Sequence, residues 1–356
     1  MTICIDCRMI DASGIGVYLR ESLPWLLQSE NDFLLLGNIG RLHCYSSNEN
    51  VKIIECGIKP FSLKELFFPL KTARQINSAN AYFSPYFNIP NFITIPVYTA
   101  IHDIIFPDMP ELTSKIGLAA RMWFYRRAYK KSKKIFTVSE FSKSRIQRHL
   151  GAKKPVIVTH SAIQPMFLEY RVKAHNIQKT QTIVFVGNIK KHKGLGILLD
   201  AFSLAKNEGL PHRLVIIGKK ENFRTSDNSV SQKINSLGSD AVTFTGFVSD
   251  EQLMEYLCAA SLLVQPSLYE GFCLPPLEAM VLGTRALISD IPVLKEIYAD
   301  FPVTFFKNAD FLDLEEKMIG LLLNNTSSSP ALPDDLLLKY TFQKTASVIL
   351  GALNNA

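Results

Sequence analysis

The chain has 356 residues, of which 47% are hydrophobic and 20% are charged. One hydrophobic core rarely organises so long a chain, so we expect two domains with the composition of an ordinary soluble enzyme. No apolar run is long enough to span a bilayer, and the amino terminus lacks the basic and apolar blocks of a signal peptide. These features predict a cytoplasmic protein.

The positive charge lies in the first half of the chain. Residues 1–165 contain 21 Lys and Arg against 12 Asp and Glu, a net charge of +9, whereas the remainder has a net charge of −2. The excess is densest in the helical-looking stretch Arg121–Lys134, which mixes cations with aromatic residues. This stretch is either a solvated helix face or a peripheral contact with the anionic inner membrane. No nucleic-acid motif accompanies it, so we expect no nucleic-acid partner.

Short β-like runs alternate with helical runs along the first half of the chain. In chain order we predict a strand over Ile3–Ile5, a helix over Gly16–Leu27, strands over Phe33–Leu36 and Lys52–Glu55, a helix over Ser62–Asn77, strands over Ala81–Phe83, Val97–Ile101 and Lys134–Val138, and a helix over Glu140–Leu150. This alternation favours a parallel sheet covered by helices on both faces.

A polar stretch interrupts the alternation, which afterwards restarts. In chain order we predict a strand over Ile183–Val186, a helix over Gly194–Asn207, strands over Arg213–Ile217 and Val242–Phe244, a helix over Asp250–Ala259, a strand over Leu262–Gln265, a helix over Pro276–Val281, a strand over Arg285–Ser289 and a last amphipathic helix over Leu336–Leu353. The sequence therefore predicts an α/β protein with two Rossmann-like, doubly wound domains. We expect ligands to bind in an interdomain cleft, because such domains bind ligands outside the carboxyl ends of their strands.

These patterns also predict domain boundaries. We expect an N-terminal domain over residues 1–168, a linker over residues 169–182 and a C-terminal domain over residues 183–335. Residues 336–356 are expected to form a C-terminal helix that packs back towards the N-terminal domain.

The strongest local motif is the stretch Pro266–Met280, where a strand ends in a turn and a helix begins with prolines. Prolines suit the first turn of a helix, and free backbone N–H groups at its start can hold an anion or hydroxyls. Glu270 and Glu278 bracket the turn at a spacing that suits hydrogen bonds to sugar and ribose hydroxyls. The alternative is that both acids only stabilise the helix, through its dipole or a lysine.

A second motif opens the second domain, where the stretch Val186–Gly194 leads from a strand through a basic loop into a helix. Lys190, Lys191 and Lys193 could neutralise a diphosphate there without a metal ion. The alternative is a surface loop with scattered lysines.

Two further candidates lie in the first domain. The Gly14–Gly16 loop follows the first strand, but Leu19 stands where a dinucleotide fingerprint has glycine, so it favours a phosphate contact more than NAD. His102 ends the strand Val97–Ile101 and could hydrogen-bond a sugar hydroxyl or serve as an acid or base, although strand-end histidines are often structural. No aspartate cluster or metal-ligand spacing is present, so we expect no metal and no cofactor.

Together these segments resemble glycosyltransferase family 4, a group of retaining enzymes with the two-domain GT-B fold. Glu270 and Glu278 are similar to its E-x7-E element, and the similarity continues through Gly283 and Thr284. The segments 13–18, 101–103 and 138–143 resemble further family segments in the expected order. The residues around His102 and Ser139 are most similar to bacterial mannosyltransferases of O-antigen and capsule assembly.

The resemblance implies roles on the nucleotide-sugar side. Glu270 would contact the donor sugar, Glu278 the nucleotide ribose, and Lys193 the diphosphate leaving group. The backbone N–H groups of Phe272, Cys273 and Leu274, which follow Gly271, would hold sugar hydroxyls or phosphate. Thr245–Val248 would lie near the base, which makes Val248 a donor-binding residue.

The resemblance also implies roles for the N-terminal, acceptor-side domain. Gly16 would approach the diphosphate, and His102 would meet the sugar. Two positions depart from the family pattern. Asn188 stands where many members have arginine, so Lys190, Lys191 or His192 would have to substitute for that cation. Cys273 replaces a residue that is commonly glycine.

The implied activity is that of a retaining, metal-independent hexosyltransferase that moves a sugar from a nucleotide sugar to a lipid-linked or polysaccharide acceptor. GDP-mannose is the favoured donor, ahead of dTDP-rhamnose and UDP-sugars. Two alternatives stay open: a nucleotide-sugar epimerase of the same architecture, and a catalytically silent GT-B scaffold subunit, which the missing arginine at Asn188 supports.

Overall fold

The computed structural model describes residues 1–12, 14–174, 177–218, 228–323 and 332–354. Contacts between residues divide the chain into an N-terminal unit, residues 1–162 together with 340–356, and a C-terminal unit, residues 163–339. Among the helices in the described ranges, none combines the length and hydrophobicity that crossing a bilayer requires.

The N-terminal unit is built on a parallel sheet of seven strands in the order β3-β2-β1-β4-β5-β6-β7. Its strands are β1 (Thr2–Asp6), β2 (Asp32–Gly37), β3 (Val51–Glu55), β4 (Ala81–Ser84), β5 (Val97–Ala100), β6 (Ser132–Thr137) and β7 (Val156–Val158). Its helices are α1 (Gly14–Leu27), α2 (Ile39–Leu42), η1 (His43–Tyr45), η2 (Leu63–Leu66), α3 (Leu70–Ile76), α4 (Ile105–Asp108), η3 (Pro110–Leu112), α5 (Lys115–Lys131), α6 (Glu140–Leu150) and α15 (Phe342–Asn354).

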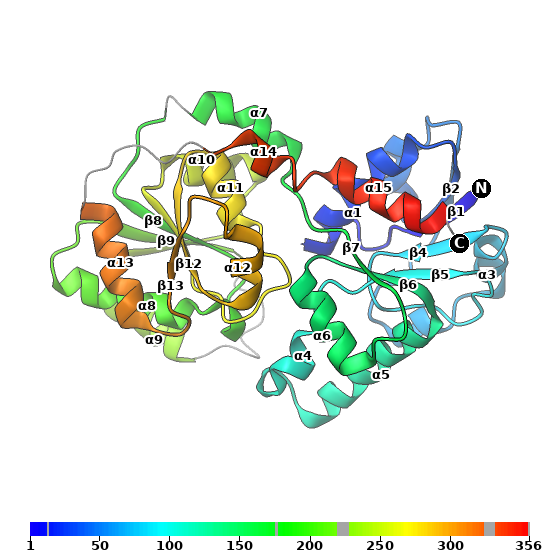
Figure 1. Ribbon diagram of the computed structural model, residues 1–356, viewed down its shortest axis with the longest axis horizontal. Coiled ribbons are helices and arrows are strands. Elements are labelled where there is room, and N and C mark those ends of the chain that lie inside the picture. Colours follow the sequence, from blue (N-terminus) through cyan, green and yellow to red (C-terminus); the bar gives the residue numbers. More distant parts are fainter. Residues whose placement is uncertain (13, 175–176, 219–227, 324–331, 355–356) are drawn as a thin grey trace. The chain divides into compact units, whose positions relative to one another are not determined.

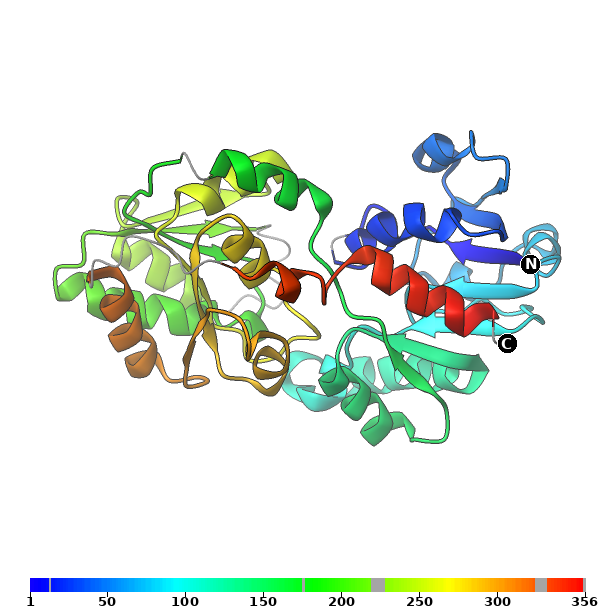
Figure 2. The same ribbon diagram turned by 45° about the horizontal axis from the view of Figure 1, so that its top comes forward.

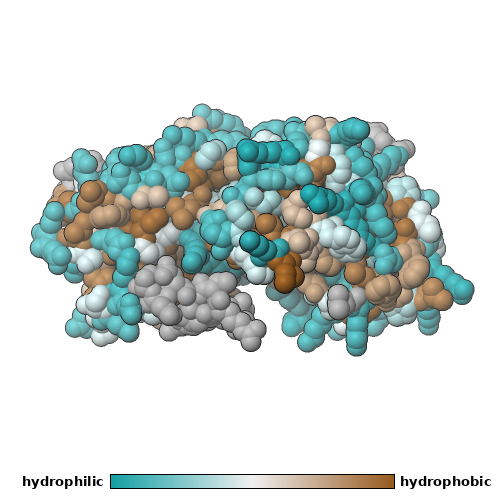
Figure 3. Space-filling model, turned by 90° about the horizontal axis from the view of Figure 1, so that it is seen from below, coloured by the Kyte–Doolittle hydropathy of each residue, from teal (hydrophilic) through white to brown (hydrophobic). Residues whose placement is uncertain are grey.

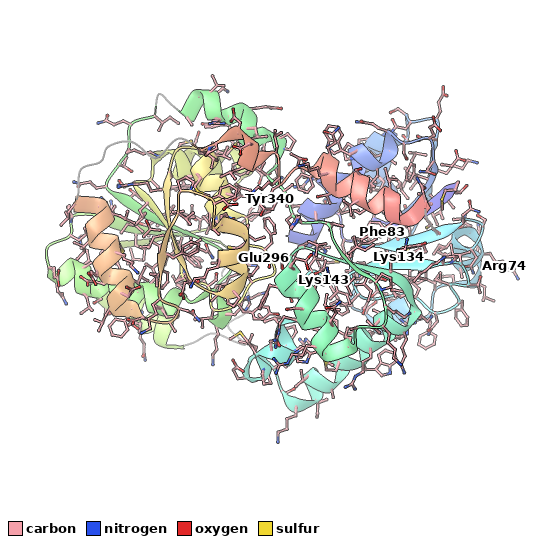
Figure 4. The ribbon with its side chains drawn as sticks, viewed as in Figure 1. Arg74, Phe83, Lys134, Lys143, Glu296 and Tyr340 are labelled. Carbon is pink, nitrogen blue, oxygen red and sulfur yellow. The ribbon has the colours of Figure 1, made fainter. Side chains whose placement is uncertain are left out.

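Helices cover both faces of this sheet. Helices α1 and α15 pack side by side on one face, and α5 and α6 lie on the other (Figure 1 and Figure 2). The last helix is tied to the unit by polar contacts as well: Lys134 Nζ of β6 donates to the carbonyl of Ala352 at 2.8 Å, and Thr345 Oγ1 donates to the carbonyl of Thr159 at 2.9 Å. Lys134 lies beside α15 in Figure 4.

The C-terminal unit repeats the design with a parallel sheet of six strands in the order β10-β9-β8-β11-β12-β13. Its strands are β8 (Thr182–Val186), β9 (Arg213–Ile217), β10 (Val242–Gly246), β11 (Leu262–Gln265), β12 (Arg285–Ser289) and β13 (Thr304–Phe306). Its helices are α7 (Pro165–Ala174), η4 (Lys191–Lys193), α8 (Leu195–Asn207), α9 (Asn228–Leu237), α10 (Asp250–Ala259), α11 (Pro275–Val281), α12 (Pro292–Tyr298), α13 (Phe311–Leu323) and α14 (Asp334–Leu337).

The core of this unit lies between the sheet and helices α8, α9 and α13, which pack against one another, while α7, α10 and α11 form a second contacting group (Figure 1). Helix α7 covers part of the stretch expected as a linker and contacts α10 and α11. Strands that we predicted in both halves appear at nearly the predicted residues. Most are short runs of buried apolar residues, such as β4 and β11, although β3 and β10 are only partly buried.

Three predicted helices were wrong in their bounds. The helix expected over Leu336–Leu353 is divided into α14 and α15, because residues 338–341 are not helical. The helix expected over Ser62–Asn77 is divided into η2 and α3, because Pro69 lacks an N–H and disfavours a helical conformation at Phe68. The stretch Arg121–Lys134 is helical only as far as Lys131, where α5 ends, and its last three residues begin β6.

Candidate functional site

The loops that follow β8, β9, β11 and β12 meet at the carboxyl edge of the C-terminal sheet. Gly187 N donates to the carbonyl of Ile217 at 2.9 Å, and Leu268 N donates to the carbonyl of His192 at 2.8 Å. Gly194 has a φ of 69°, and a Cβ placed there would lie 1.8 Å from the carbonyl oxygen of Pro266. Only glycine therefore fits where the basic loop turns into α8, and this close packing holds the loop against the segment after β11.

An ion pair joins these two loops. Lys193 Nζ lies 2.6 Å from Glu270 Oε1, with side-chain exposures of 22% and 9%. Ser267 Oγ donates to the same carboxylate oxygen at 2.7 Å, and Gln265 Nε2 donates to Ser267 Oγ at 3.0 Å. A polar chain thus runs from the end of β11 to the cation of the basic loop, and it fixes the position of the Glu270 carboxylate.

The charge state of the pair follows from its surroundings. Burial raises the pKa of Glu270, but the charge of Lys193 and the hydrogen bonds from Lys193 and Ser267 outweigh burial, so the pKa is lowered from its ordinary value. Burial, followed by the charge of Lys193, lowers the pKa of the neighbouring His192 to about 4. At neutral pH the site therefore holds a carboxylate, an ammonium group and a neutral imidazole.

The turn between Glu270 and α11 contains a strained residue. Cys273 has a φ of 79°, in the left-handed region that glycine adopts readily and other residues rarely do. Its carbonyl accepts a hydrogen bond from Tyr298 Oη at 2.5 Å. Burial, together with the neighbouring Glu270 carboxylate, raises the pKa of its thiol. The position at which the sequence has cysteine in place of the family's usual glycine is thus one whose backbone favours glycine.

Glu278 lies on α11 in a different environment. The residue is buried, and among the described residues no hydrogen-bond donor offsets the effect of burial on its carboxylate. Burial raises the pKa of Glu278 to about 7, and the charge of Asp250 acts in the same direction. Asp250 begins α10 two residues after Val248, so Val248 and Glu278 lie on adjoining elements.

The other predicted donor residues occupy the surrounding loops. Asn188 is half-buried directly after Gly187, and Lys190 and Lys191 are exposed. Lys190 and Lys191 line a cavity of about 350 Å³ together with Lys233 of α9. Gly271, Phe272 and Leu274 form the turn with Cys273, and Phe272 is buried whereas Leu274 is half-buried. Within the described ranges, no three His, Cys, Asp or Glu side chains are grouped so that they could share a metal ion.

The two predicted residues of the N-terminal unit lie at the carboxyl edge of its own sheet. His102 follows β5, and its Nε2 lies 2.9 Å from the carbonyl of Pro85. A carbonyl only accepts, so Nε2 carries the proton. Burial lowers the pKa of His102 to about 4 against the opposing effect of that bond, and the neutral ring has Nδ1 as an acceptor. Its ring packs edge-on against Tyr18, with 4.8 Å between centroids.

Gly16 has a structural reason for being glycine. A Cβ at this position would lie 2.7 Å from the carbonyl oxygen of Ile10, so the first turn of α1 packs directly on the loop after β1. This close contact accounts for the glycine without a ligand, and it also brings the backbone of α1 to the carboxyl edge of the sheet.

Sequence reasoning missed a buried polar cluster in this unit. The Arg8 guanidinium binds the carboxylate of Asp6, with its Nη2 2.6 Å from Oδ2, and Nη2 lies 2.9 Å from Glu65 Oε1. Tyr82 Oη also donates to Asp6 at 2.7 Å. The signal in the sequence was Asp6, an acid at the end of an otherwise apolar strand, which requires a buried partner. Ser267 and Gln265 were missed as well, because their role depends on a contact with Glu270.

Comparisons with known proteins agree with this geometry. Residues 167–331 match the family described as Glycosyl transferases group 1. The chain is 29% identical over 230 residues to the O-antigen chain mannosyltransferase B of Escherichia coli, covering 62% of this chain and 59% of that protein. It is 28% identical over 206 residues to the O-antigen chain mannosyltransferase RfbU of Salmonella typhimurium, covering 55% and 53%. The chain thus spans less than two thirds of the length of these curated relatives.

A solved structure supports the fold. The structure of Anabaena HepE in complex with UDP and glucose matches with a TM-score of 0.70 and 16% sequence identity, covering 100% of both chains. At this identity the likeness shows the fold alone. Together with the two parallel sheets, it confirms the predicted GT-B architecture of two Rossmann-like domains.

Proposed function

Because residues 167–331 match the family described as Glycosyl transferases group 1, we propose that the chain is a retaining hexosyltransferase using a nucleotide-sugar donor. The observation that carries the proposal is the pair formed by the half-buried Lys193 and the buried Glu270, which Ser267 holds at the carboxyl edge of the C-terminal sheet. Ligands of doubly wound sheets bind at this edge. A fixed ammonium group beside a fixed carboxylate suits a substrate that presents phosphate next to sugar hydroxyls.

Lys193 supplies the positive charge for the diphosphate leaving group. Its distance of 2.6 Å to Glu270 means that the ammonium is already oriented before donor binds. As the glycosidic C–O bond breaks, negative charge grows on the phosphate oxygen, and an ammonium held close by stabilises that charge more than it stabilises the ground state. Lys190 and Lys191 are exposed on the same loop and add to the positive potential.

Glu270 acts as a hydrogen-bond acceptor for the donor sugar. Its lowered pKa keeps it ionised at neutral pH, so it can accept bonds from sugar hydroxyls and stabilise an oxocarbenium-like centre. The acceptor hydroxyl attacks C1 from the face that the diphosphate leaves, which gives retention. Its proton passes to a phosphate oxygen of the leaving group, so the reaction needs no base from the protein and depends on positioning.

Other residues complete the assignment. Glu278 is assigned to the ribose hydroxyls and Val248 to the base. Asn188 and the turn Gly271–Leu274 are assigned to the phosphates and the sugar. In the N-terminal unit, Gly16 is assigned to the diphosphate and His102 to the sugar. We propose that the reaction needs no divalent metal, because lysines neutralise the diphosphate.

The donor and the acceptor are proposed from the relatives. Both relatives described above are named O-antigen chain mannosyltransferases, which supports GDP-mannose as donor and a lipid-linked or polysaccharide acceptor of cell-surface glycan synthesis. dTDP-rhamnose and UDP-sugars are the donors to test next.

The test is a transfer assay with labelled GDP-mannose and a membrane fraction that contains lipid-linked glycan acceptors. We expect label in a glycan product with release of GDP, and an axial anomeric bond by NMR when the donor is α-linked. The Glu270→Gln variant should lose at least about 100-fold in turnover, as loss of a transition-state contact does. The control variant Glu251→Gln, at an exposed residue of α10, should keep its activity.

The alternatives give different results. A sugar epimer that forms without acceptor or glycan product would identify an epimerase. Donor binding without transfer or hydrolysis, across the three donor classes, would identify a silent scaffold subunit. Unchanged turnover in Glu270→Gln would remove Glu270 from the site.

A further inference from the structure

Two segments of the N-terminal unit carry an unusual charge distribution. Residues 56–102 and 112–139 contain 12 Lys and Arg but a single acidic residue, Glu65. Glu65 is fully buried and paired with Arg8, with 2.9 Å between Oε1 and Nη2. The surface of these two segments therefore presents cations without an exposed carboxylate.

Large apolar side chains are exposed on the same segments. Phe67, Phe92 and Trp123 have exposed fractions of 64%, 52% and 52%, and Leu70 is 65% exposed. Scattered exposed apolar residues are ordinary, but three aromatic rings among cations are the composition of a membrane-interface surface. Figure 3 looks onto the side of the molecule that carries α4 and α5, and it shows apolar residues interspersed with hydrophilic ones on this unit.

Side-chain and backbone contacts join these residues into one surface. The Arg127 guanidinium of α5 lies 5.8 Å from the ring of Trp123 and donates to Asn91 Oδ1 at 2.6 Å. Asn91 N donates to the carbonyl of Leu66 at 2.9 Å, next to Phe67. Asn77, which caps α3, donates from Nδ2 to the carbonyl of Phe92 at 2.7 Å. We call the surface over α5, α3 and the loops around Phe67 and Phe92 the aromatic–basic face.

Backbone geometry sets Phe92 apart. Its φ is 66°, in the left-handed region, although half of its side chain is exposed. Phe61, in the loop before η2, shares both features, with a φ of 62° and 54% exposure. A left-handed conformation disfavours a bulky residue. The Phe61 ring packs on Tyr86 and Phe87, with 5.6 Å between centroids in both pairs, whereas the half-exposed ring of Phe92 recovers less packing energy in return. Strained backbone of this kind is associated with function.

We propose that the aromatic–basic face docks on an anionic phospholipid bilayer. Cations attract the anionic headgroups, and Phe67, Phe92 and Trp123 enter the boundary between headgroups and acyl chains. Nucleic acid would also attract the cations, but an aliphatic side chain such as Leu70 gains nothing from it. The proposal concerns lipid binding alone, so it stands or fails independently of the proposed transfer reaction.

The geometry also shows which parts of Arg121–Lys134 take part. Arg121 stacks on Phe106, 4.0 Å from its ring centroid, and Tyr125 and Tyr129 are buried against the sheet. Lys134 is bound to α15. The outward cations of this stretch are thus Arg126, Lys130, Lys131 and Lys133, and further cations come from Lys64, Lys71 and Arg74. Arg74 lies at the outer edge of the unit in Figure 4.

The test is co-sedimentation of the full chain with phosphatidylcholine vesicles that contain 30% phosphatidylglycerol or none. We expect the wild type to bind only the anionic vesicles. Each cation near an anionic membrane strengthens binding about fivefold, so the charge variant Lys64→Glu/Lys71→Glu/Arg74→Glu should bind at least about 100-fold more weakly at low salt. The control Lys52→Glu/Lys173→Glu/Lys344→Glu reverses three exposed lysines elsewhere and should bind within about tenfold of the wild type.

An apolar variant separates insertion from charge. Phe67→Ser/Phe92→Asn/Trp123→Ser should lower vesicle binding by about tenfold or more. Its melting temperature should stay unchanged or rise, because asparagine tolerates the left-handed conformation better than phenylalanine. No binding of the wild type to anionic vesicles would overturn the proposal. So would binding that the apolar variant retains in full, or that the control loses as strongly as the charge variant, since either result describes general attraction of a basic protein.

Discussion

Replacing Lys193 by methionine tests the physical basis of the ion pair with Glu270. Methionine keeps most of the side-chain volume and removes the ammonium, so the buried carboxylate loses its main counter-charge. Removing one member of a fully buried pair costs about 3–5 kcal/mol. Here we expect about 2 kcal/mol, because Lys193 is 22% exposed and Ser267 still donates to the carboxylate. For a unit of this size, that corresponds to a fall in melting temperature of roughly 4–8 °C.

The stability that Lys193→Met loses should depend on pH, with a larger loss at higher pH. In the wild type the pKa of Glu270 is lowered, so the pair stabilises the fold above the ordinary pKa of glutamate, and this contribution disappears as pH falls through the lowered value. In Lys193→Met burial acts unopposed by the ammonium, so the pKa of Glu270 should rise and stability should fall as pH increases. The difference between the two proteins should therefore be small at pH 4 and complete at pH 7.5.

Thermal unfolding at both pH values measures this difference. The double variant Lys193→Met/Glu270→Gln should recover most of the loss, because it leaves no buried charge, and the exposed substitution Lys173→Met serves as the control. A penalty that is equal at pH 4 and pH 7.5, or a double variant less stable than Lys193→Met, would refute the reasoning.

Four further predictions concern Gly194, Cys273, Glu278 and the metal requirement. Gly194→Ala should cost about 3 kcal/mol or more in unfolding free energy, because its Cβ would lie 1.8 Å from the Pro266 carbonyl, and a melting temperature within 2 °C of wild type would contradict this. Cys273→Gly should be more stable than Cys273→Ala by about 1 kcal/mol, since only glycine relieves the φ of 79°; denaturation that ranks them in reverse order disproves the strain. Burial raises the pKa of Glu278 to about 7, so wild-type stability should fall by about 3 kcal/mol between pH 4.5 and 7, and Glu278→Gln should lack this fall when melting is measured across that range. Transfer activity should survive EDTA, and loss that Mn²⁺ restores would establish a metal requirement.

The fold was largely predictable because its signals are local. Most of the parallel strands are short apolar runs that both faces of the sheet bury, so strands such as Arg213–Ile217 and Arg285–Ser289 are found at the predicted residues. The bounds of the helices were harder to predict from the sequence. Pro69 divides one predicted helix, and α7 forms in a polar stretch that read as a linker, because its contacts with α10 and α11 are tertiary.

The site was predictable as a set of motifs and not as a set of contacts. The basic loop and the Glu270 turn each stood out in the sequence, but the sequence contains no sign that Lys193 and Glu270 pair at 2.6 Å. The strained backbone of Cys273 had a signal, since the family usually has glycine there. Gly16 also has a packing reason of its own, which the sequence did not indicate because the contact with Ile10 forms only once α1 packs on the loop after β1.

Donor affinity tests the central claim, that Lys193 meets the diphosphate of a nucleotide sugar. Isothermal titration of wild type, Lys193→Met and Lys173→Met with GDP-mannose, dTDP-rhamnose and UDP-glucose identifies the donor and the contribution of Lys193 together. A charged hydrogen bond of up to about 3 kcal/mol predicts that Lys193→Met binds the preferred donor about 100-fold more weakly, with Lys173→Met unchanged. Affinity of Lys193→Met within threefold of wild type would contradict the assignment, as would a wild type that binds none of the three.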